Sequence, residues 1–218
     1  MRIETVSGVS FNTFEPDAQD VRLDDIAWAT SRMPRFAGHT IPVIPYSVAQ
    51  HAMCVADELY NMFATDDHVK EYPQEILEAR AKYLKNHNKD DAAFLRMAMH
   101  GLLHDAAEAY IGDIASPVKH LPGLREQIVK IEDNILKSIY NAFNLEYPTD
   151  EEQVFIHYAD MVQRTVEAYN FMFSRGKDWG DLPSTTLKRL QQFESPMQSI
   201  DAYDKFIVKF NDLKEQLQ

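Results

Sequence analysis

The most apolar segment of the chain is AAFLRMAMHGLLHDAAEAYIG, residues 92–112. It is long enough to form a central buried helix, with Asp90 or Asp91 as its N-cap. Gly112 fits the C-terminal stop of such a helix, and Pro117 follows shortly afterwards. The segment therefore predicts a helical core around which the rest of the chain packs.

Helical patterns continue on both sides of this segment. Asp24 is well placed to cap a first helix and Ser47 a second one, and residues 149–152 (TDEE) match a capping box. The segment RFAGHTIPVIP, residues 35–45, reads as irregular because of its glycine and prolines. The further helices that we expect cover residues 24–32, 48–63, 73–85, 123–143, 150–173 and 196–217.

Composition supports an all-α fold. Only 7 of the 218 residues are glycine, which disfavours sandwiches, barrels and glycine-rich phosphate loops. Hydrophobic residues make up 45% and charged residues 26%, an ordinary globular balance. Because no repeat or long linker is visible, we expect one domain over 1–218, with a core at about 24–173 and a C-terminal helical extension over 174–218.

The charge balance limits the possible partners. With 22 basic and 34 acidic residues the net charge is −12, so the chain lacks the broad cationic surface that nucleic-acid binding requires. Cys54 is the only cysteine, which excludes an intramolecular disulfide and fits a reducing cytosol. The first 20 residues contain no signal-peptide core, and no apolar run reaches membrane-spanning length. We therefore expect a cytoplasmic protein without membrane contact.

Ionisable residues inside apolar helices point to a metal site. His104 and Asp105 lie side by side in the central segment, where burial is costly unless something compensates for it. His51 and Asp160 lie in apolar stripes of two other expected helices. One such histidine alone is more often a core residue than a ligand, but the ordered set is more specific. Two imidazoles and two carboxylates suit a divalent cation with open positions that could activate water.

The chain resembles the HD-domain phosphohydrolases. The resemblance rests on RFAGH (35–39), YSVAQH (46–51), LLHDAAEAYIGDIASPVK (102–119) and the later Asp160, which follow the order of the family and span residues 24 to about 170. It is strongest to the helical subgroup of bacterial 5′-deoxynucleotidases and phage dATP triphosphohydrolases. This resemblance implies an all-α fold, a divalent-metal site and hydrolysis of the bond between a deoxynucleoside 5′-oxygen and its phosphate.

The resemblance also implies roles for acidic residues. Glu108, one helical turn beyond His104, would position or deprotonate the attacking water; the alternative, a solvated helix-surface glutamate, fits its apolar neighbours less well. Asp113 would assist proton transfer or organise the site, or it caps the turn that follows. The metal would be held by His51, His104, Asp105 and Asp160.

Substrate contacts follow from the same resemblance. Arg35 and Lys119 occupy the two positions that grip phosphate, the first as a fork and the second as a point charge. Phe36 would crowd the sugar and exclude a ribose 2′-hydroxyl, with an ordinary core residue as the equal alternative. His39 would line the same pocket or hydrogen-bond the loop. His100 we interpret as core packing or as a support for the metal ligands.

Two substrates and one non-catalytic function remain open. We favour a dNTP triphosphohydrolase, with dATP as substrate and deoxynucleoside plus triphosphate as products, because the RFAGH to YSVAQH spacing is most similar to the phage enzymes. A 5′-deoxynucleotidase acting on dNMPs would use every one of the same residues. A non-catalytic nucleotide-binding HD protein would not need Glu108, Arg35 or Lys119. An enzyme acting on RNA or cyclic dinucleotides fits the acidic balance less well.

The cofactor and assembly are implied only in outline. The ligand set accepts zinc, cobalt, manganese, iron or nickel, and a triphosphate would bring additional magnesium or cobalt ions at its phosphates. The relatives imply a homo-oligomer, either a dimer or a hexamer. If the chain is encoded by a phage, the compartment is the host cytoplasm.

Overall fold

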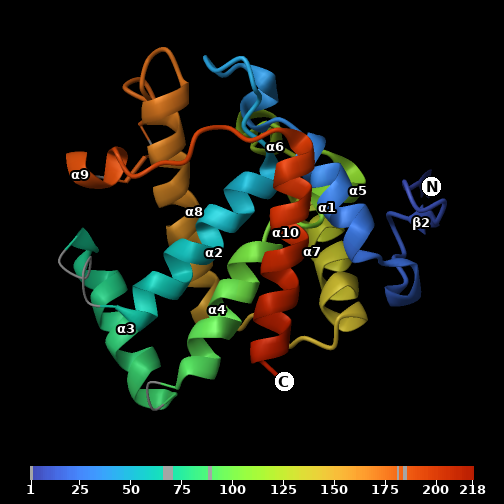
Figure 1. The fold of residues 1–218 in the computed structure, drawn as a ribbon, viewed down its shortest axis with the longest axis horizontal. Helices are drawn as coiled ribbons and strands as arrows, with labels where there is room; N and C mark the ends of the chain where they lie inside the picture. The colour runs from blue at the N-terminus through green and yellow to red at the C-terminus, as the bar shows by residue number, and fades with distance from the viewer. Residues whose placement is uncertain (1, 66–70, 88–89, 181, 184–185) are drawn as a thin grey trace.

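Helices build the described part of the chain, as predicted. The computed structural model describes residues 2–65, 71–87, 90–180, 182–183 and 186–218 (Figure 1). A short antiparallel hairpin, β1 (Arg2–Glu4) with β2 (Ser10–Asn12), precedes the helices and was not predicted. Two 3₁₀ turns are η1 (Ala18–Asp20) and η2 (Arg35–Gly38). The α-helices are α1 (Leu23–Arg32), α2 (Val48–Ala64), α3 (Gln74–Asn86), α4 (Asp91–Leu103), α5 (Glu108–Ile111), α6 (Ser116–Lys119), α7 (Arg125–Ala142), α8 (Asp150–Phe171), α9 (Leu187–Leu190) and α10 (Ser199–Gln216).

Helix α2 lies at the centre of the packing. It contacts α1, α4, α8 and α10, and Figure 1 shows it crossing the middle of the molecule. Gly101 of α4 lies against α2, where an added Cβ would come within 2.8 Å of Leu59 Cδ1 and 2.9 Å of Ala56 Cα. Only glycine allows helices to approach this closely. The contact holds the C-terminal end of α4 against α2 and so brings two of the predicted ligands together.

Two apolar clusters surround this centre. The larger one includes Phe206, Phe210 and Leu213, so the C-terminal segment that we described as an extension packs into the main core. The smaller one joins α3 to α4 and α8 through Tyr83, Phe94 and Phe155. In the described part of the chain, no helix combines the length and hydropathy that crossing a bilayer requires.

The predicted central helix is interrupted at the histidine–aspartate pair. Helix α4 ends at Leu103 and α5 starts at Glu108, with i→i−3 hydrogen bonds between them, such as Ala106 N to Leu103 O at 2.9 Å. The His104 Nδ1–H donates to Gly101 O at 2.7 Å, the carbonyl that a continuing α-helix would use for Asp105. The prediction of one continuous helix is therefore wrong, because a side chain competes for the backbone acceptor.

The helix caps were largely predicted. Ser47 accepts a hydrogen bond from Gln50 N, Asp90 accepts one from Ala92 N, and the capping box of α8 is present. The prediction for Asp24 is wrong because Arg22 occupies the N-cap of α1 and the Asp24 carboxylate accepts from Tyr203 of α10. A tertiary contact has taken a side chain that local geometry would place at the cap.

Candidate metal centre

His51 lies in the first turn of α2, and its side chain is fully buried. Its Nδ1 contacts Glu167 Oε1 at 2.6 Å. Its Nε2 faces the other way, at 3.1 Å from Asp160 Oδ1 and 3.7 Å from Asp105 Oδ2. The imidazole therefore bridges a supporting carboxylate on one side and two predicted ligands on the other.

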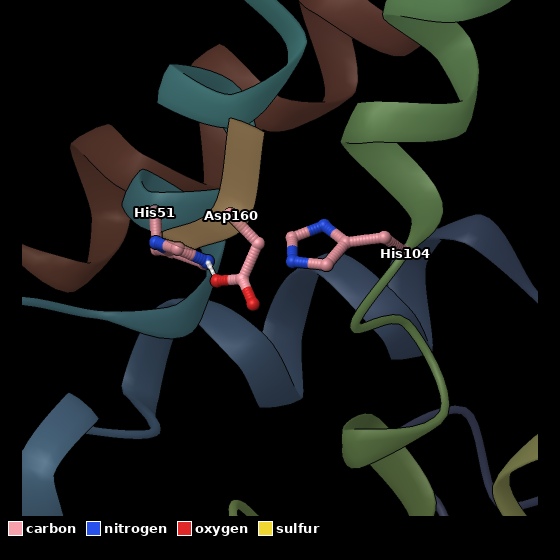
Figure 2. A group of neighbouring side chains, drawn as sticks. All are labelled: His51, His104 and Asp160. Atoms are coloured by element: carbon pink, nitrogen blue, oxygen red, sulfur yellow. Dashed lines mark ion pairs between the residues drawn. The ribbon is translucent and has the colours of Figure 1, made fainter. Parts of the chain in front are cut away.

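All four predicted metal ligands meet. Figure 2 shows His51, His104 and Asp160 pointing toward one another from α2, the end of α4 and α8. One ligand atom from each of these three residues lies within 4.8 Å of the others. Asp105 completes the group, because its Oδ2 lies 3.2 Å from His104 Nε2. Residues from three distant parts of the sequence thus form one N₂O₂ cluster.

The cluster fits a divalent metal. The Nε2 atoms of His51 and His104 are both buried and have no hydrogen-bond partner among the described residues. Each ring binds elsewhere through Nδ1, His51 to Glu167 and His104 to the Gly101 carbonyl. A ring that donates through Nδ1 keeps its lone pair on Nε2, which is the arrangement of a metal-bound imidazole. The two aspartates add the negative charge that a cation requires.

The pKa shifts show that the cluster lacks positive charge. Burial and Arg35 lower the pKa of His51, but Glu167 and Asp160 outweigh them and raise it to about 9. Burial raises the pKa of Asp160, yet its contact with His51 brings it down to about 2. Burial likewise raises the pKa of Asp105, but His104, His51 and Arg35 hold it well below its usual range. In the absence of metal, a proton on His51 supplies the missing positive charge.

Arg35 lies against the ligand carboxylates. Its Nη1 is 3.3 Å from Asp105 Oδ2, its Nη2 is 4.0 Å from Asp160 Oδ1, and its Nε is 3.4 Å from Glu167 Oε2. Its backbone N–H donates to Tyr46 O at 2.8 Å, which fixes the turn η2 to the start of α2. The predicted phosphate-binding cation therefore sits beside the predicted metal ligands.

The turn η2 carries backbone strain at the residue predicted to crowd the sugar. Phe36 has φ 55° and the next residue, Ala37, has φ 51°, both in the left-handed region that non-glycine residues rarely adopt. The centroid of the Phe36 ring lies 5.6 Å from that of the Trp179 ring. The Arg35 guanidinium lies 5.6 Å from the centroid of the Phe36 ring. His39 ends the turn with its side chain exposed, so its predicted substrate contact stays a prediction.

The buried Glu108 and the half-buried Lys119 form an ion pair near the cluster. Lys119 Nζ lies 3.4 Å from Glu108 Oε1 and 2.8 Å from Glu132 Oε1. Burial, Asp105 and Asp113 raise the pKa of Glu108 to about 9 despite Lys119 and Arg35. Asp113 is half-buried, and burial also raises its pKa. Because Glu108 opens α5, the single-helix argument that aligned it with His104 is wrong, yet the charge of Asp105 still acts on it.

Comparison with known proteins identifies the family. The family model described as "5'-deoxynucleotidase YfbR-like" matches residues 76–210. The chain belongs to this family. It is similar to the uncharacterized protein YfdR of Escherichia coli K12, at 29% identity over 217 residues, which cover 98% of this chain and 96% of YfdR. It is also similar to the uncharacterized protein RCAP_rcc00048 of Rhodobacter capsulatus, at 29% identity over 140 residues, which cover 64% and 57% of the two chains.

Membership of the YfbR-like family confirms the HD-domain resemblance. These proteins are metal-dependent phosphohydrolases of the HD type, so the chain is an enzyme of that class. The matched region contains His104, Asp105 and Asp160, while the similarity to YfdR extends over nearly the whole chain, including Arg35 and His51.

Glu167 contacts both His51 and Arg35 but was not among the predicted site residues. The spacing could have indicated it, because Glu167 follows Asp160 by seven residues and so lies on the same face of helix α8. The contact of Trp179 with Phe36 was also missed, because nothing in a loop sequence indicates where the loop returns. His100 proved to be a core residue, buried with its Nδ1 3.1 Å from Tyr140 Oη.

Proposed function

We propose that the protein hydrolyses the 5′-phosphoester of deoxynucleotides, with His51, His104, Asp105 and Asp160 holding a divalent metal. The observation that carries this proposal is the convergence of two buried imidazole Nε2 atoms on two carboxylates beside the buried Arg35. Family membership supports the reaction class. A bound metal would supply positive charge that polarises the phosphate and activates water.

The chain's own residues would bind the phosphate and move the proton. The Arg35 fork and the Lys119 ammonium would hold phosphoryl oxygens and stabilise the charge that develops on them. Glu108 would take the proton of the attacking water at Oε2, a buried atom without a hydrogen-bond partner among the described residues. Because its pKa is raised to about 9, Glu108 holds a proton near neutral pH in the metal-free protein, and the positive charges of Lys119 and Arg35 favour the ionised form that a base requires.

Monophosphates are the better supported substrates. The family description names a 5′-deoxynucleotidase. Arg35 and Lys119 both already face carboxylates, and a net charge of −12 offers little help to a triphosphate. The resemblance of the RFAGH to YSVAQH spacing to phage enzymes favours dATP as the second candidate, with additional metal ions at its phosphates.

Product analysis would separate the two substrates. The protein loaded with zinc, cobalt or manganese would be incubated with dAMP and with dATP, and the released phosphates identified. We expect orthophosphate and deoxyadenosine from dAMP. Triphosphate released from dATP, with dAMP left intact, would contradict the monophosphate assignment. AMP and ATP would serve as matched ribonucleotide controls for the crowding role of Phe36.

A non-catalytic nucleotide-binding role is tested by Asp105→Ala. We expect this variant to lose turnover while its far-ultraviolet circular dichroism stays helical, because Asp105 lies in the turn between α4 and α5 rather than in the core. Turnover that survived the substitution would show that the assigned cluster is not the active site.

A further inference from the structure

Glu167 is the buried carboxylate at which the metal cluster and the phosphate-binding arginine meet. Its side chain is 2% exposed, its Oε1 lies 2.6 Å from His51 Nδ1, and its Oε2 lies 3.4 Å from Arg35 Nε. We propose that Glu167 is a positioning residue that fixes the orientation of His51 toward the metal and of Arg35 toward the phosphate. This inference rests on the proposed metal site and assigns that site a further residue.

One helix supplies both a metal ligand and this support. Asp160 and Glu167 are seven residues apart on α8, about two turns, so both side chains face α2. Asp160 approaches the Nε2 edge of His51 while Glu167 approaches its Nδ1 edge. The imidazole is therefore held from both sides by a single rigid element, which leaves it little freedom to rotate.

The first consequence concerns the tautomer of His51. Because a carboxylate accepts from Nδ1–H, the neutral ring keeps its lone pair on Nε2, and Nε2 is the atom that faces Asp160 and Asp105. Without Glu167, neither the tautomer nor the ring angle would be fixed. Carboxylates that support metal-bound histidines in this way contribute about 10-fold to 100-fold to metal affinity.

The second consequence concerns the direction of Arg35. Glu167 Oε2 forms an ion pair with Nε at 3.4 Å, although neither atom has a hydrogen-bond partner among the described residues, while Nη1 and Nη2 face Asp105 and Asp160. These outer nitrogens form the fork that binds a phosphate through two parallel hydrogen bonds. A carboxylate that served only to neutralise charge would need contact with one of the two partners, whereas Glu167 contacts both.

The same helix offers a matched control. Glu152 is also buried on α8, and its Oε1 contacts Arg96 Nε at 3.4 Å while its Oε2 lies 4.0 Å from His100 Nε2. Like Glu167, Glu152 lies beside one arginine and one histidine, but it belongs to the core and not to the metal cluster. Glu167→Gln and Glu152→Gln remove one negative charge each from comparable places.

The test measures metal affinity directly. The dissociation constants of Co²⁺ and Zn²⁺ would be determined by chelator competition for wild type, Glu167→Gln and Glu152→Gln at one pH. We expect Glu167→Gln to weaken binding about 10-fold to 100-fold and to change the visible absorption of bound Co²⁺, with Glu152→Gln within twofold of wild type. Affinity of Glu167→Gln within twofold of wild type, or equal losses in both variants, would overturn the proposal.

A measurement on the wild-type protein covers the case in which Glu167→Gln does not fold. In the Zn²⁺-loaded protein, ¹⁵N NMR of the imidazoles should show His51 coordinated through Nε2 and protonated at Nδ1. Coordination through Nδ1 would refute the role of Glu167.

A separate variant tests the underlying site. His51→Asn should abolish tight metal binding. If His51→Asn kept wild-type affinity, the metal site itself would be wrong, whereas loss in His51→Asn together with wild-type affinity in Glu167→Gln would reject only the positioning role.

Discussion

Helix α8 carries two buried carboxylates whose surroundings look alike but behave differently. Glu167 faces His51 and Arg35, and Glu152 faces His100 and Arg96. The pKa of His51 is raised to about 9, whereas burial lowers the pKa of His100 to about 4. A histidine beside a buried glutamate thus becomes more basic at one end of the helix and less basic at the other.

The difference lies in whether the negative charge is satisfied. Both oxygens of Glu152 are hydrogen-bonded, to Thr149 in the capping box and to Tyr83 and Arg96. Around His51, by contrast, Asp105 and Asp160 add two further carboxylates. Satisfied charge stabilises the fold, while the excess charge at the other end of α8 is what the proposed metal site would use to bind a cation.

The largest expected effect is the loss of activity in Asp160→Asn. This variant removes a ligand carboxylate and its contact with His51, so we expect kcat/KM to fall by more than the roughly 100-fold that a supporting residue contributes. Steady-state kinetics at saturating metal would measure the fall. Rates would be given per folded molecule, because the lowered pKa of Asp160 shows that its ionised form also stabilises the metal-free fold. A fall of less than tenfold would contradict the ligand role.

The next largest effect is expected from replacing the arginine beside Glu167, compared with the arginine beside Glu152. Arg35→Lys keeps the charge but loses the fork that faces Asp105 and Asp160, and we expect kcat/KM to fall about 10-fold to 100-fold, with much of the effect in KM. Arg96→Lys makes the equivalent change beside Glu152 and should leave the kinetics within twofold. Equal kinetic losses in the two variants would mean that the distinction between site and core is false.

Glu152→Ala should affect stability instead of catalysis. The substitution removes the capping box of α8 and leaves the Tyr83 hydroxyl without its acceptor, so we expect the free energy of unfolding to fall by about 2 kcal/mol. Urea unfolding would measure the loss. The turnover number per folded molecule should stay within twofold of wild type, and a selective catalytic loss would show that Glu152 serves the active site.

Much of the fold and of the candidate metal site could be predicted from the sequence. His51, His104, Asp105 and Asp160 were found because ionisable residues in apolar helices need partners, and most helices followed from periodicity and caps. The family resemblance then supplied roles that spacing alone could not.

Other features depend on contacts that local patterns do not encode. The break at His104 arises from one side-chain hydrogen bond to Gly101 O. The role of Glu167 requires the packing of α8 on α2, and the contact of Trp179 with Phe36 requires the path of a loop.

The smallest expected effect concerns pH and separates the two histidines by sign. His100 has a folded pKa of about 4, below the value near 6.5 of an unfolded chain. Between these values the unfolded state binds more protons, so the contribution of His100 to stability is present above about pH 6.5 and is lost as the pH falls toward 4. His51 in the metal-free protein has the opposite sign, with stability present below about pH 6.5 and lost as the pH rises through about 9.

Difference measurements isolate each histidine from the other titrating groups. Urea unfolding of metal-free wild type and His100→Gln would be compared from pH 4 to 7, and the wild-type stability should fall more steeply with acid, by at most about 1.4 kcal/mol per pH unit. The matching comparison of His51→Gln between pH 6.5 and 9 should flatten the alkaline decline. Parallel curves for His100→Gln and wild type would show that His100 titrates normally, and the contrast between the two ends of α8 would then rest on the metal cluster alone.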